Sequence, residues 1–211
     1  VWNILKEYQK MCKELLALPT LTGRKTEKEK FAGAKYTTTI EAFMPDGKAL
    51  QCGTSHNLGQ GFAKAFNIKY SDKSEKQQTP WQSSWGFSTR LIGACVMTHS
   101  DDRGLILPPK LAPTQIVIIP ILIKGKEADV LKKARELKKQ LEGKFSVSLD
   151  ERTEYSPGWK FSEYEMKGIP LRIEIGPNDI TKKQVVLVRR DENKKIGINL
   201  ESLEKKIKTE L

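Results

Sequence analysis

The chain has 211 residues, 38% of them hydrophobic and 30% charged, which is the length and composition of one large or two modest globular domains. Lys and Arg number 37 against 26 Asp and Glu, a net charge of +11, yet no block of five basic residues occurs, so charge alone slightly favours a solubilising surface over one that binds a polyanion. Three cysteines without CxxC spacing and only two histidines argue against a disulfide framework and a metal site, and no apolar run has the length of a membrane span or the pattern of a signal peptide. We therefore expect a cytoplasmic protein.

The first half of the chain mixes helical and strand patterns. Apolar residues recur at three- and four-residue spacing over residues 1–16, which predicts an amphipathic helix ended by Pro19. The β-branched run at 37–43 predicts a strand, and the turn signal Pro45-Asp46-Gly47 predicts a hairpin into a second strand. The other expected elements are a polar loop at 22–35, the second strand at 49–52, a helix at 57–66, a polar loop at 71–79, and a run at 87–97 whose periodicity fits helix and strand alike.

The pattern changes after Pro108, Pro109 and Pro113. Strands then alternate with helices, which implies α/β layers joined by right-handed crossovers. We place the domain boundary near Pro113, which gives domains of residues 1–113 and 114–211. The expected elements are strands at 116–123, 147–149, 171–175 and 184–190, and helices at 130–141, 161–166 and 200–211, the last capped by Asn199.

The stretch QCGTSHNLGQGF, at residues 51–62, combines glycines with hydroxyl and imidazole groups. Gly53 follows an apparent strand end, where a glycine lets a ligand approach the backbone closely. The alternative is a hairpin turn whose polar residues cap a helix that begins near Asn57, and spacing alone favours this alternative. Ser55 and His56 are adjacent and would point apart on a strand, so they are not read as part of a Ser-His-Asp triad.

A second stretch, WGFSTRLIGACVMTHSDDRGLILPP, covers residues 85–109. Trp85 beside Gly86 fits plain core packing, the commoner case, or the apolar wall of a small pocket. Arg90 lies in an otherwise apolar run, where burying an arginine is costly unless it pairs with a carboxylate or holds a ligand. The adjacent carboxylates at 101–102 are read as a solvated turn.

Basic and aromatic side chains interleave in the stretch DERTEYSPGWKFSEYEMKG. Arg152, Tyr155, Trp159 and Lys160 together suit single-stranded RNA, because bases stack on aromatic rings while basic groups meet phosphates. A surface loop with scattered charge is the alternative.

These stretches together resemble the prolyl-tRNA synthetases, a family of class II aminoacyl-tRNA synthetases. The resemblance extends to TGRKTEKEKFAGAKYTTTIEAF upstream and YSPGWKFSEYEMKGIPLRIEIGPND downstream, so it covers most of the chain. WGFSTR corresponds to the family's motif 3, with its arginine at Arg90. The short connection between Thr39 and Gln51 leaves no room for the editing insertion of the bacterial type, so the chain resembles the archaeal/eukaryotic type. Gly61 and Ser100 depart from the Asn and Gly expected in many relatives.

The resemblance implies a fold of the α/β class: part of a class II antiparallel-sheet catalytic domain that carries motif 3, followed by an α/β anticodon-binding domain with a mixed sheet. It favours a helix for the run at 87–97. It implies no catalytic side chain and no metal ligand. The binding residues that it implies are Gln51, Thr54 and Arg90 for ATP, His56, Trp85 and Gly86 for proline, and Arg152 and Lys160 for tRNA.

The activity implied by the resemblance is that of a proline–tRNA ligase. Such an enzyme uses ATP and Mg²⁺ to convert proline to prolyl-adenylate and transfers the prolyl group to tRNA(Pro), and we expect the intact enzyme to be a homodimer. Because the chain lacks motif 1 and motif 2, we expect the isolated 211-residue fragment to be inactive. A non-catalytic RNA-binding or regulatory fragment derived from a synthetase is the alternative, and a class II synthetase for another small amino acid is a weaker one.

Overall fold

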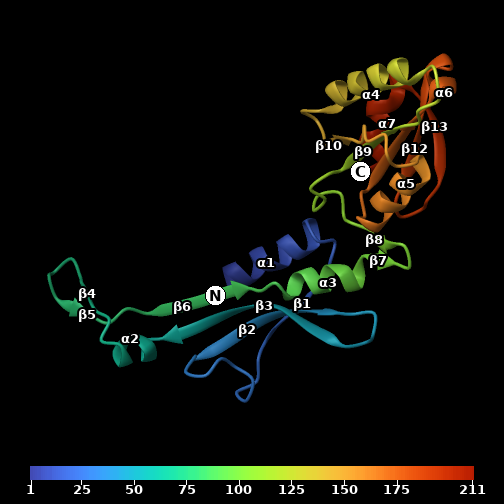
Figure 1. Ribbon diagram of the computed structural model, residues 1–211. Helices are drawn as coiled ribbons and strands as arrows, with labels where there is room; N and C mark the ends of the chain where they lie inside the picture. Colours follow the sequence, from blue (N-terminus) through green and yellow to red (C-terminus); the bar gives the residue numbers. More distant parts are fainter. The chain divides into compact units, whose positions relative to one another are not determined.

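The computed structural model describes residues 1–211, which form two compact units, residues 1–98 and 99–211. The compact units divide earlier in the chain than the boundary near Pro113, which stays a prediction. Figure 1 shows the elements of both units coloured along the sequence. The first unit contains α1 (Trp2–Glu14), β1 (Leu21–Arg24), β2 (Tyr36–Phe43), β3 (Ala49–Gly59), α2 (Gly61–Ala65), β4 (Tyr70–Ser71), β5 (Gln77–Gln78), β6 (Gln82–Phe87) and α3 (Arg90–Thr98).

A four-stranded antiparallel sheet, in the order β1-β2-β3-β6, organises the first unit. The predicted strand at 37–43 is confirmed as β2, and the predicted helix at 87–97 as α3. The second strand of the hairpin does not end at Cys52, as predicted, but continues to Gly59. Its backbone groups find partners on β2 at one side and β6 at the other, so the residues read as a turn lie inside a strand. The sequence reading also missed β1, inside the predicted polar loop, and β6.

Helix α1 packs on one face of this sheet, as its apolar spacing predicts. Leu5 and Cys12 are fully buried under it. The ring centroids of Tyr8 and Phe87 lie 3.8 Å apart, and a Cβ added to Gly53 would lie 3.1 Å from atoms of both rings. The glycine therefore lets helix and sheet approach closely, and the opposite face of the sheet is the one left for polar groups.

The end of β3 leads into a short helix and a hairpin, which Figure 1 shows at the end of the strand remote from the β2–β3 turn. Gly59 has a φ of +60°, a conformation that favours glycine, and ends the strand. The helix predicted at 57–66 is therefore reduced to α2, of 5 residues. The predicted polar loop contains the two-residue strands β4 and β5, whose turn is held by Asp72 through the backbone N–H groups of Ser74 and Lys76.

The second unit is an α/β structure with a mixed sheet, in the order β10-β9-β11-β12-β13. β9 is parallel to both β10 and β11, whereas β12 and β13 pair antiparallel. The elements are β7 (Ser100–Asp101), β8 (Gly104–Leu105), β9 (Ile116–Pro120), α4 (Glu127–Leu141), β10 (Val147–Leu149), α5 (Pro157–Met166), β11 (Leu171–Ile175), α6 (Pro177–Thr181), β12 (Gln184–Arg189), β13 (Lys195–Asn199), the 3₁₀ turn η1 (Leu200–Ser202) and α7 (Leu203–Glu210).

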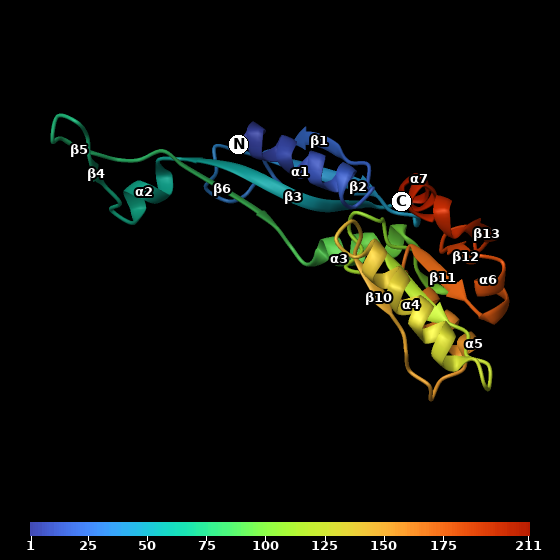
Figure 2. The same cartoon turned by 90° about the horizontal axis from the view of Figure 1, so that it is seen from above.

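The two faces of this second sheet are covered differently. One face is apolar: Ile118, Ile173 and Leu187 pack in one cluster with Leu137 of α4 and Ile207 of α7. Helix α5 lies over the other face, and Figures 1 and 2 show the sheet between α5 and α4. The predicted apolar strands and amphipathic helices are confirmed, and together they bury a single core on the α4 side.

The face beneath α5 buries ion pairs among apolar side chains such as Val117, Ile119 and Val188, and the sequence pattern did not predict these pairs. Arg172 and Glu174 alternate with apolar residues along β11, a pattern that is typical of solvent-facing positions, yet both are buried. The guanidinium of Arg172 lies 2.9 Å from Glu174 and 3.0 Å from Glu165 of α5, and Lys195 lies 2.8 Å from Glu174. Each buried charge thus has an opposite partner, which is the condition under which a charge is tolerated in an interior.

The acidic pair at 101–102 lies at the exposed turn between β7 and β8, as expected from the sequence, but one of its carboxylates has a further role. Asp101 does form a turn, accepting a hydrogen bond from the backbone N–H of Arg103. However, its carboxylate also accepts two hydrogen bonds, at 2.9 and 2.5 Å, from the buried guanidinium of Arg190. This pair holds the hairpin on the second unit, and the guanidinium keeps the pKa of the Asp101 carboxyl well below its usual range.

Three smaller corrections concern helix ends. Helix α5 begins at Pro157 and not at 161, because the hydroxyl of Ser156 accepts a hydrogen bond from the backbone N–H of Trp159 and proline suits the first turn. Asn199 ends the unpredicted strand β13, and its side chain makes no capping bond. The unpredicted α6 starts where the Asp179 carboxylate accepts a hydrogen bond from the backbone N–H of Gly176.

None of the helices in this structure has the length and apolar character needed to cross a membrane.

Two glycines of the second unit allow the β7–β8 hairpin to touch the end of α5. A Cβ on Gly104, whose φ is +129°, would lie 2.5 Å from the Cα and O atoms of Met166. A Cβ on Gly168 would lie 2.6 Å from Leu105. Distances this short cannot be relieved by rotating a side chain when the neighbour is backbone.

We expect Gly104→Ala to lower the free energy of unfolding of the second unit by more than about 3 kcal/mol, the sum of backbone strain and overpacking. Gly143→Ala is the matched control: its φ is +93° but nothing lies within 4 Å of the added Cβ, so it should cost about 1 kcal/mol. Urea denaturation followed by circular dichroism measures both. Equal losses for the two variants would show that the contact with Met166 carries no weight.

Candidate functional site

The polar face of the first sheet, opposite α1, gathers most of the residues predicted to bind small molecules. On a strand, successive side chains project to opposite faces, and directly paired residues of neighbouring strands project to the same face. His56 pairs with Thr37, and Thr54 pairs with Thr39 on β2 and with Gly86 on β6. These five positions therefore share one face, which we call the open face.

Gln51 reaches the open face only because β3 is irregular. It is three residues from Thr54 and would lie on the opposite face of a regular strand. The pairing with β2 shifts between Ile40 and Glu41, since Ile40 pairs with Gly53 and Glu41 pairs with Gln51, leaving one extra residue on β3. Such a bulge reverses the alternation, so both predicted ATP contacts on β3 project to the same side.

His56 is held at both ring nitrogens. Its Nδ1 lies 2.9 Å from the hydroxyl of Thr37, and its Nε2 lies 3.1 Å from the hydroxyl of Thr54. The ring of Phe31 lies 4.9 Å from the imidazole, centroid to centroid. Burial, and secondarily the positive charge of Lys25, lowers the pKa of His56 below its ordinary value. The site therefore presents a neutral, oriented imidazole.

The loop at residues 25–35 lies against the open face through backbone contacts. The N–H of Lys25 donates to the carbonyl of Thr37, and the N–H of Lys35 donates to the carbonyl of Asn57, at 2.9 and 2.7 Å. Gly33, with a φ of +82°, lies so close to Phe62 that an added Cβ would be 2.9 Å from the ring. These contacts bring Phe31 beside His56.

Trp85 does not join the other predicted proline-binding residues on the open face. It pairs with Ser55, whereas Gly86 pairs with Thr54, so the Trp85 side chain projects to the opposite face. It is 53% exposed there. Nothing lies within 4 Å of a Cβ built on Gly86, which leaves open space in front of Thr54.

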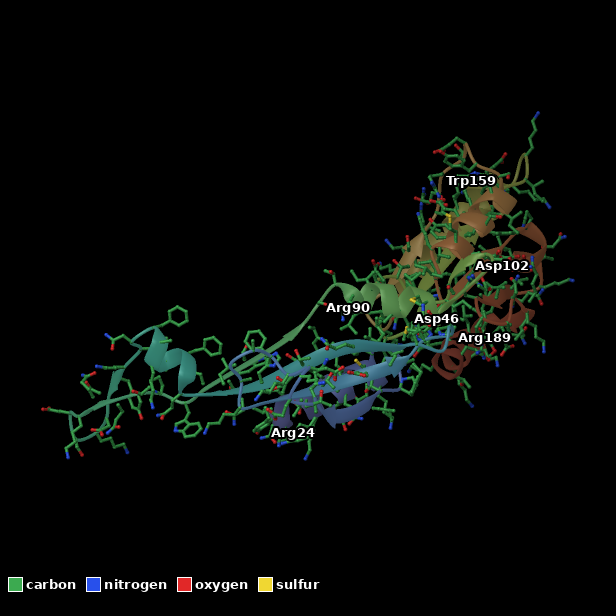
Figure 3. The ribbon with its side chains drawn as sticks, turned by 90° about the horizontal axis from the view of Figure 1, so that it is seen from below. Arg24, Asp46, Arg90, Asp102, Trp159 and Arg189 are labelled. Atoms are coloured by element: carbon green, nitrogen blue, oxygen red, sulfur yellow. The ribbon has the colours of Figure 1, made fainter.

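Arg90 is the first residue of α3, and Figure 3 labels it there. The inference that it is buried among apolar residues is wrong, because the helix exposes it. Its Nη1 donates to the backbone carbonyl of Gln51 at 3.3 Å. This contact places a positive charge beside the end of the open face that carries Gln51.

Two residues of this site were missed from the sequence, Phe31 and Thr37. The signal for Thr37 was available, since extending the second strand past His56 pairs the two residues. Phe31 had no comparable signal, because it lies in a loop whose path is set by contacts distant in sequence.

In the second unit, aromatic and basic side chains form a stacked surface at the start of α5. The rings of Tyr155 and Trp159 lie 3.9 Å apart at 13°, and the guanidinium of Arg152 lies 4.9 and 5.4 Å from their centroids. Both rings are partly exposed, and Figure 3 labels Trp159. A hollow of about 210 Å³ lies beside them, lined by residues that include Pro120, Leu122 and Arg152.

Asp150 anchors this surface from below. Its carboxylate is buried and accepts hydrogen bonds from Arg152 at 3.0 and 2.7 Å and from the hydroxyl of Tyr164 at 3.2 Å. Burial alone would raise the pKa of Asp150, but the hydrogen bonds from Arg152 and the charge of Lys160 outweigh it and hold the pKa at about 2. Arg152 also pairs with Glu163, so its guanidinium is fixed on two sides.

Lys160 lies inside this cluster and not on the surface. It is 2% exposed, and its Nζ donates to the backbone carbonyls of Asp150 and Arg152 and lies 3.3 Å from the Asp150 carboxylate. To reach an RNA phosphate it would have to leave these partners. Of the two residues predicted to bind tRNA, the structure thus exposes Arg152, whose side chain is 35% exposed, and buries Lys160.

Comparison with known proteins supplies the class of both units. Residues 1–99 match the sequence model of the tRNA synthetase class II core domain (G, H, P, S and T), and residues 115–210 match that of the anticodon binding domain. The chain is a class II core segment followed by an anticodon-binding domain. The predicted fold class, an antiparallel-sheet segment and then an α/β domain with a mixed sheet, is confirmed.

Individual relatives resemble this chain over nearly its whole length. It is 58% identical over 205 residues to a protein named "Proline--tRNA ligase" from Ruminiclostridium cellulolyticum, and 58% and 55% identical to proteins of the same name from Lachnoclostridium phytofermentans and Alkaliphilus oremlandii. Each match covers 97% of this chain and 42% of the relative, so the chain spans about two fifths of their length. These relatives are bacterial and lend no support to the archaeal/eukaryotic type.

The low pKa of His56 makes the stability of the first unit depend on pH. Because the pKa is below 6.5 in the folded chain, the unfolded chain binds a proton at higher pH than the folded one. This contribution to stability is full above the unfolded pKa and is lost as the pH falls through the folded pKa. We expect NMR titration of the His56 ring to give a midpoint below 6.5, and His56→Gln to flatten the decline in stability between pH 7.5 and 5. A midpoint at or above 6.5 would contradict the burial of the ring.

Proposed function

We propose that this chain is the part of a proline–tRNA ligase that contributes one wall of the amino-acid and ATP site together with the anticodon-binding domain. The observation that carries the proposal is the similarity to proline–tRNA ligases over 97% of the chain, joined to an open face that presents His56, Thr54 and Gly86 together. The reaction is activation of proline by ATP to prolyl-adenylate, followed by transfer of the prolyl group to tRNA(Pro).

On this proposal the open face divides between two substrates. Gln51, Thr54 and Arg90 contact ATP, where the exposed guanidinium at the start of α3 meets phosphate and adenine. His56 and Gly86 contact proline. Trp85 contributes through its backbone beside Gly86, since its side chain lies on the opposite face. Catalysis of this kind rests on positioning and on stabilising charge, and no side chain of the chain serves as nucleophile.

The remaining partners follow from the same reaction. Mg²⁺ is proposed to act with ATP by neutralising phosphate charge, and residues 1–211 contain no group of three or more His, Cys, Asp or Glu side chains that could hold a metal. The intact enzyme is proposed to be a cytoplasmic homodimer. The type without an editing insertion is also proposed, because β2 and β3 are joined by the turn at 44–48 alone.

The aromatic surface of the second unit is proposed to bind the anticodon loop. Tyr155 and Trp159 offer faces on which unstacked bases can stack, and Arg152, fixed by Asp150 and Glu163, offers donors at their edge. Lys160 acts from beneath by holding the backbone of this loop. A non-catalytic RNA-binding fragment would use the same surface, and activity measurements separate the two functions.

The activity is tested in a chimeric enzyme in which residues 1–211 replace the matching segment of the Ruminiclostridium cellulolyticum protein. We expect ATP–pyrophosphate exchange with proline and with no other amino acid. Arg90→Ala should lower the exchange rate by about 100- to 1,000-fold, the usual cost of losing one preorganised charge contact. Arg24→Ala is the matched control, because Arg24 is an exposed arginine on β1 whose partner Thr38 faces away from the open face.

Absence of exchange in a folded chimera, or exchange with a different amino acid, would reject the proposed function. Equal losses for Arg90→Ala and Arg24→Ala would reject the placement of ATP.

RNA binding is tested on the 211-residue chain itself, with a labelled anticodon stem-loop of tRNA(Pro). Trp159→Ala should weaken binding by about 5- to 150-fold, because base–aromatic stacking contributes about 1–3 kcal/mol per base. Trp81→Ala in the first unit is the matched control, since this tryptophan is also exposed and also lies against a cation, Lys35. Equal affinities for the two variants would remove the stacked pair from the RNA surface.

A further inference from the structure

The hydroxyl of Thr37 is buried between two groups and has no other partner. Thr37 is 1% exposed. Its Oγ1 accepts a hydrogen bond from the backbone N–H of Phe31 at 2.9 Å and lies 2.9 Å from Nδ1 of His56. Because the N–H of Phe31 can only donate, His56 is the one partner to which the hydroxyl of Thr37 can donate a hydrogen bond.

This arrangement distinguishes the two neutral forms of the imidazole. If Nδ1 of His56 is unprotonated, it accepts a hydrogen bond from the Thr37 hydroxyl. The N–H of Phe31, the hydroxyl of Thr37 and Nδ1 of His56 are then all paired. If Nδ1 carries the proton, both groups present donors to the same oxygen, and the hydroxyl proton of Thr37 is left buried without an acceptor. A buried unpaired donor is unfavourable enough to shift such an equilibrium by about tenfold or more.

The second ring nitrogen extends this row of hydrogen bonds toward the open face. We call the row, which joins Phe31, Thr37, His56 and Thr54, the relay. With Nδ1 unprotonated, Nε2 of the neutral ring carries the proton and donates to the hydroxyl of Thr54, 3.1 Å away. Thr54 is partly exposed, and its hydroxyl has no other partner within the chain, so its own proton points to the open face. Gly86, directly across on β6, leaves space there, because nothing lies within 4 Å of a Cβ built on it.

We propose that Thr37, held by the backbone of Phe31, is a positioning residue that fixes His56 in the Nε2–H form and so makes the hydroxyl of Thr54 an outward donor to an anionic oxygen of the substrate. The oxygen belongs to a carboxylate or a phosphate, the two acceptors that the proposed reaction brings to this face, so this part of the inference rests on the proposed function. The relay itself does not rest on it.

Two further observations fit hydrogen bonds that are donated in one direction, from Phe31 toward Thr54. Burial and then the charge of Lys25 lower the pKa of His56, which keeps the ring neutral and its Nδ1 available as an acceptor. The backbone contacts of Lys25 to Thr37 and of Lys35 to Asn57 fix both ends of the loop, so the N–H of Phe31 is presented to Thr37 at a set position. A ring with both nitrogens held also keeps one rotamer.

The first test reads the tautomer directly by ¹⁵N NMR of the histidine rings in the 211-residue chain at pH 8. The chain has only two histidines, so a His99→Gln variant assigns the signals of His56. We expect Nδ1 of His56 at the unprotonated frequency and Nε2 at the protonated one. Thr37→Val, which keeps the side-chain shape and removes the hydroxyl, should shift the ratio of the two forms by about tenfold or more toward Nδ1–H.

Two variants control this measurement. Thr38→Val removes a buried hydroxyl that donates to the carbonyl of Ser55 on the other face, and it should leave the ring signals unchanged. Thr37→Ser retains the hydroxyl and should restore the wild-type ratio. The Nδ1–H form in the unchanged chain, or an equal shift in Thr37→Val and Thr38→Val, would overturn the relay.

The second test reads the outward donor in the chimeric enzyme through the Michaelis constants for proline and ATP. Thr37→Val should raise one of the two by about tenfold with a smaller change in turnover, and Thr54→Val should raise the same one. A rise for proline identifies a carboxylate as the acceptor, and a rise for ATP identifies a phosphate. Unchanged constants for both substrates would overturn the outward role of Thr54, whereas an inactive parent chimera would reject the proposed function and leave the NMR result standing.

Discussion

The first unit depends on one strand that is paired along both edges. β3 runs for 11 residues between β2 and β6. This one strand supplies both the residues that face α1 and those that lie on the open face. Because side chains alternate along a regular strand, a shift of register by one residue would exchange the two sets. The irregularity between Ile40 and Glu41 is therefore not a defect: it is what places Gln51 on the side of Thr54 while Cys52 stays buried toward α1.

The second unit meets a different constraint, since its sheet is covered on both faces but buries ion pairs on only one of them. On the α4 side, burial of aliphatic side chains supplies the stability. On the α5 side, Asp150, Arg172 and Glu174 are buried with opposite charges beside them. Exchanging such pairs for apolar residues is often neutral for stability, whereas removing one partner alone is costly, so ionic packing is better explained by positioning than by stability. The charges set where α5 and the loop before it lie on the sheet.

The sequence alone predicts the elements whose pattern is local, and it does not predict those that depend on pairing between distant residues. Helix α1, the apolar strands and the helix α4 were predictable because their periodicity is local. The end of β3 was not, since GTSH contains residues that favour turns and only their pairing with β2 and β6 makes them a strand. The same dependence explains the site. His56, Thr54 and Gly86 were named through a family resemblance, whereas their common face, and the projection of Trp85 to the other one, follow from register alone. The buried position of Lys160 was unpredictable because a lysine in a polar loop is usually solvated.

In both sites, buried polar groups hold a more exposed polar group in position. In the first unit, buried Thr37 holds His56, which in turn holds the partly exposed Thr54. In the second, Asp150 and Lys160, both buried, hold Arg152 against the stacked rings. Under the proposed function, the outer group in each site is already oriented before its ligand binds, so less conformational entropy is lost on binding. On the same proposal, this explains why a basic residue of the stretch at 150–168 is buried inside the domain: at Lys160 the positive charge contributes more by fixing the donor at Arg152 than it would as one more flexible amine on a chain of net charge +11.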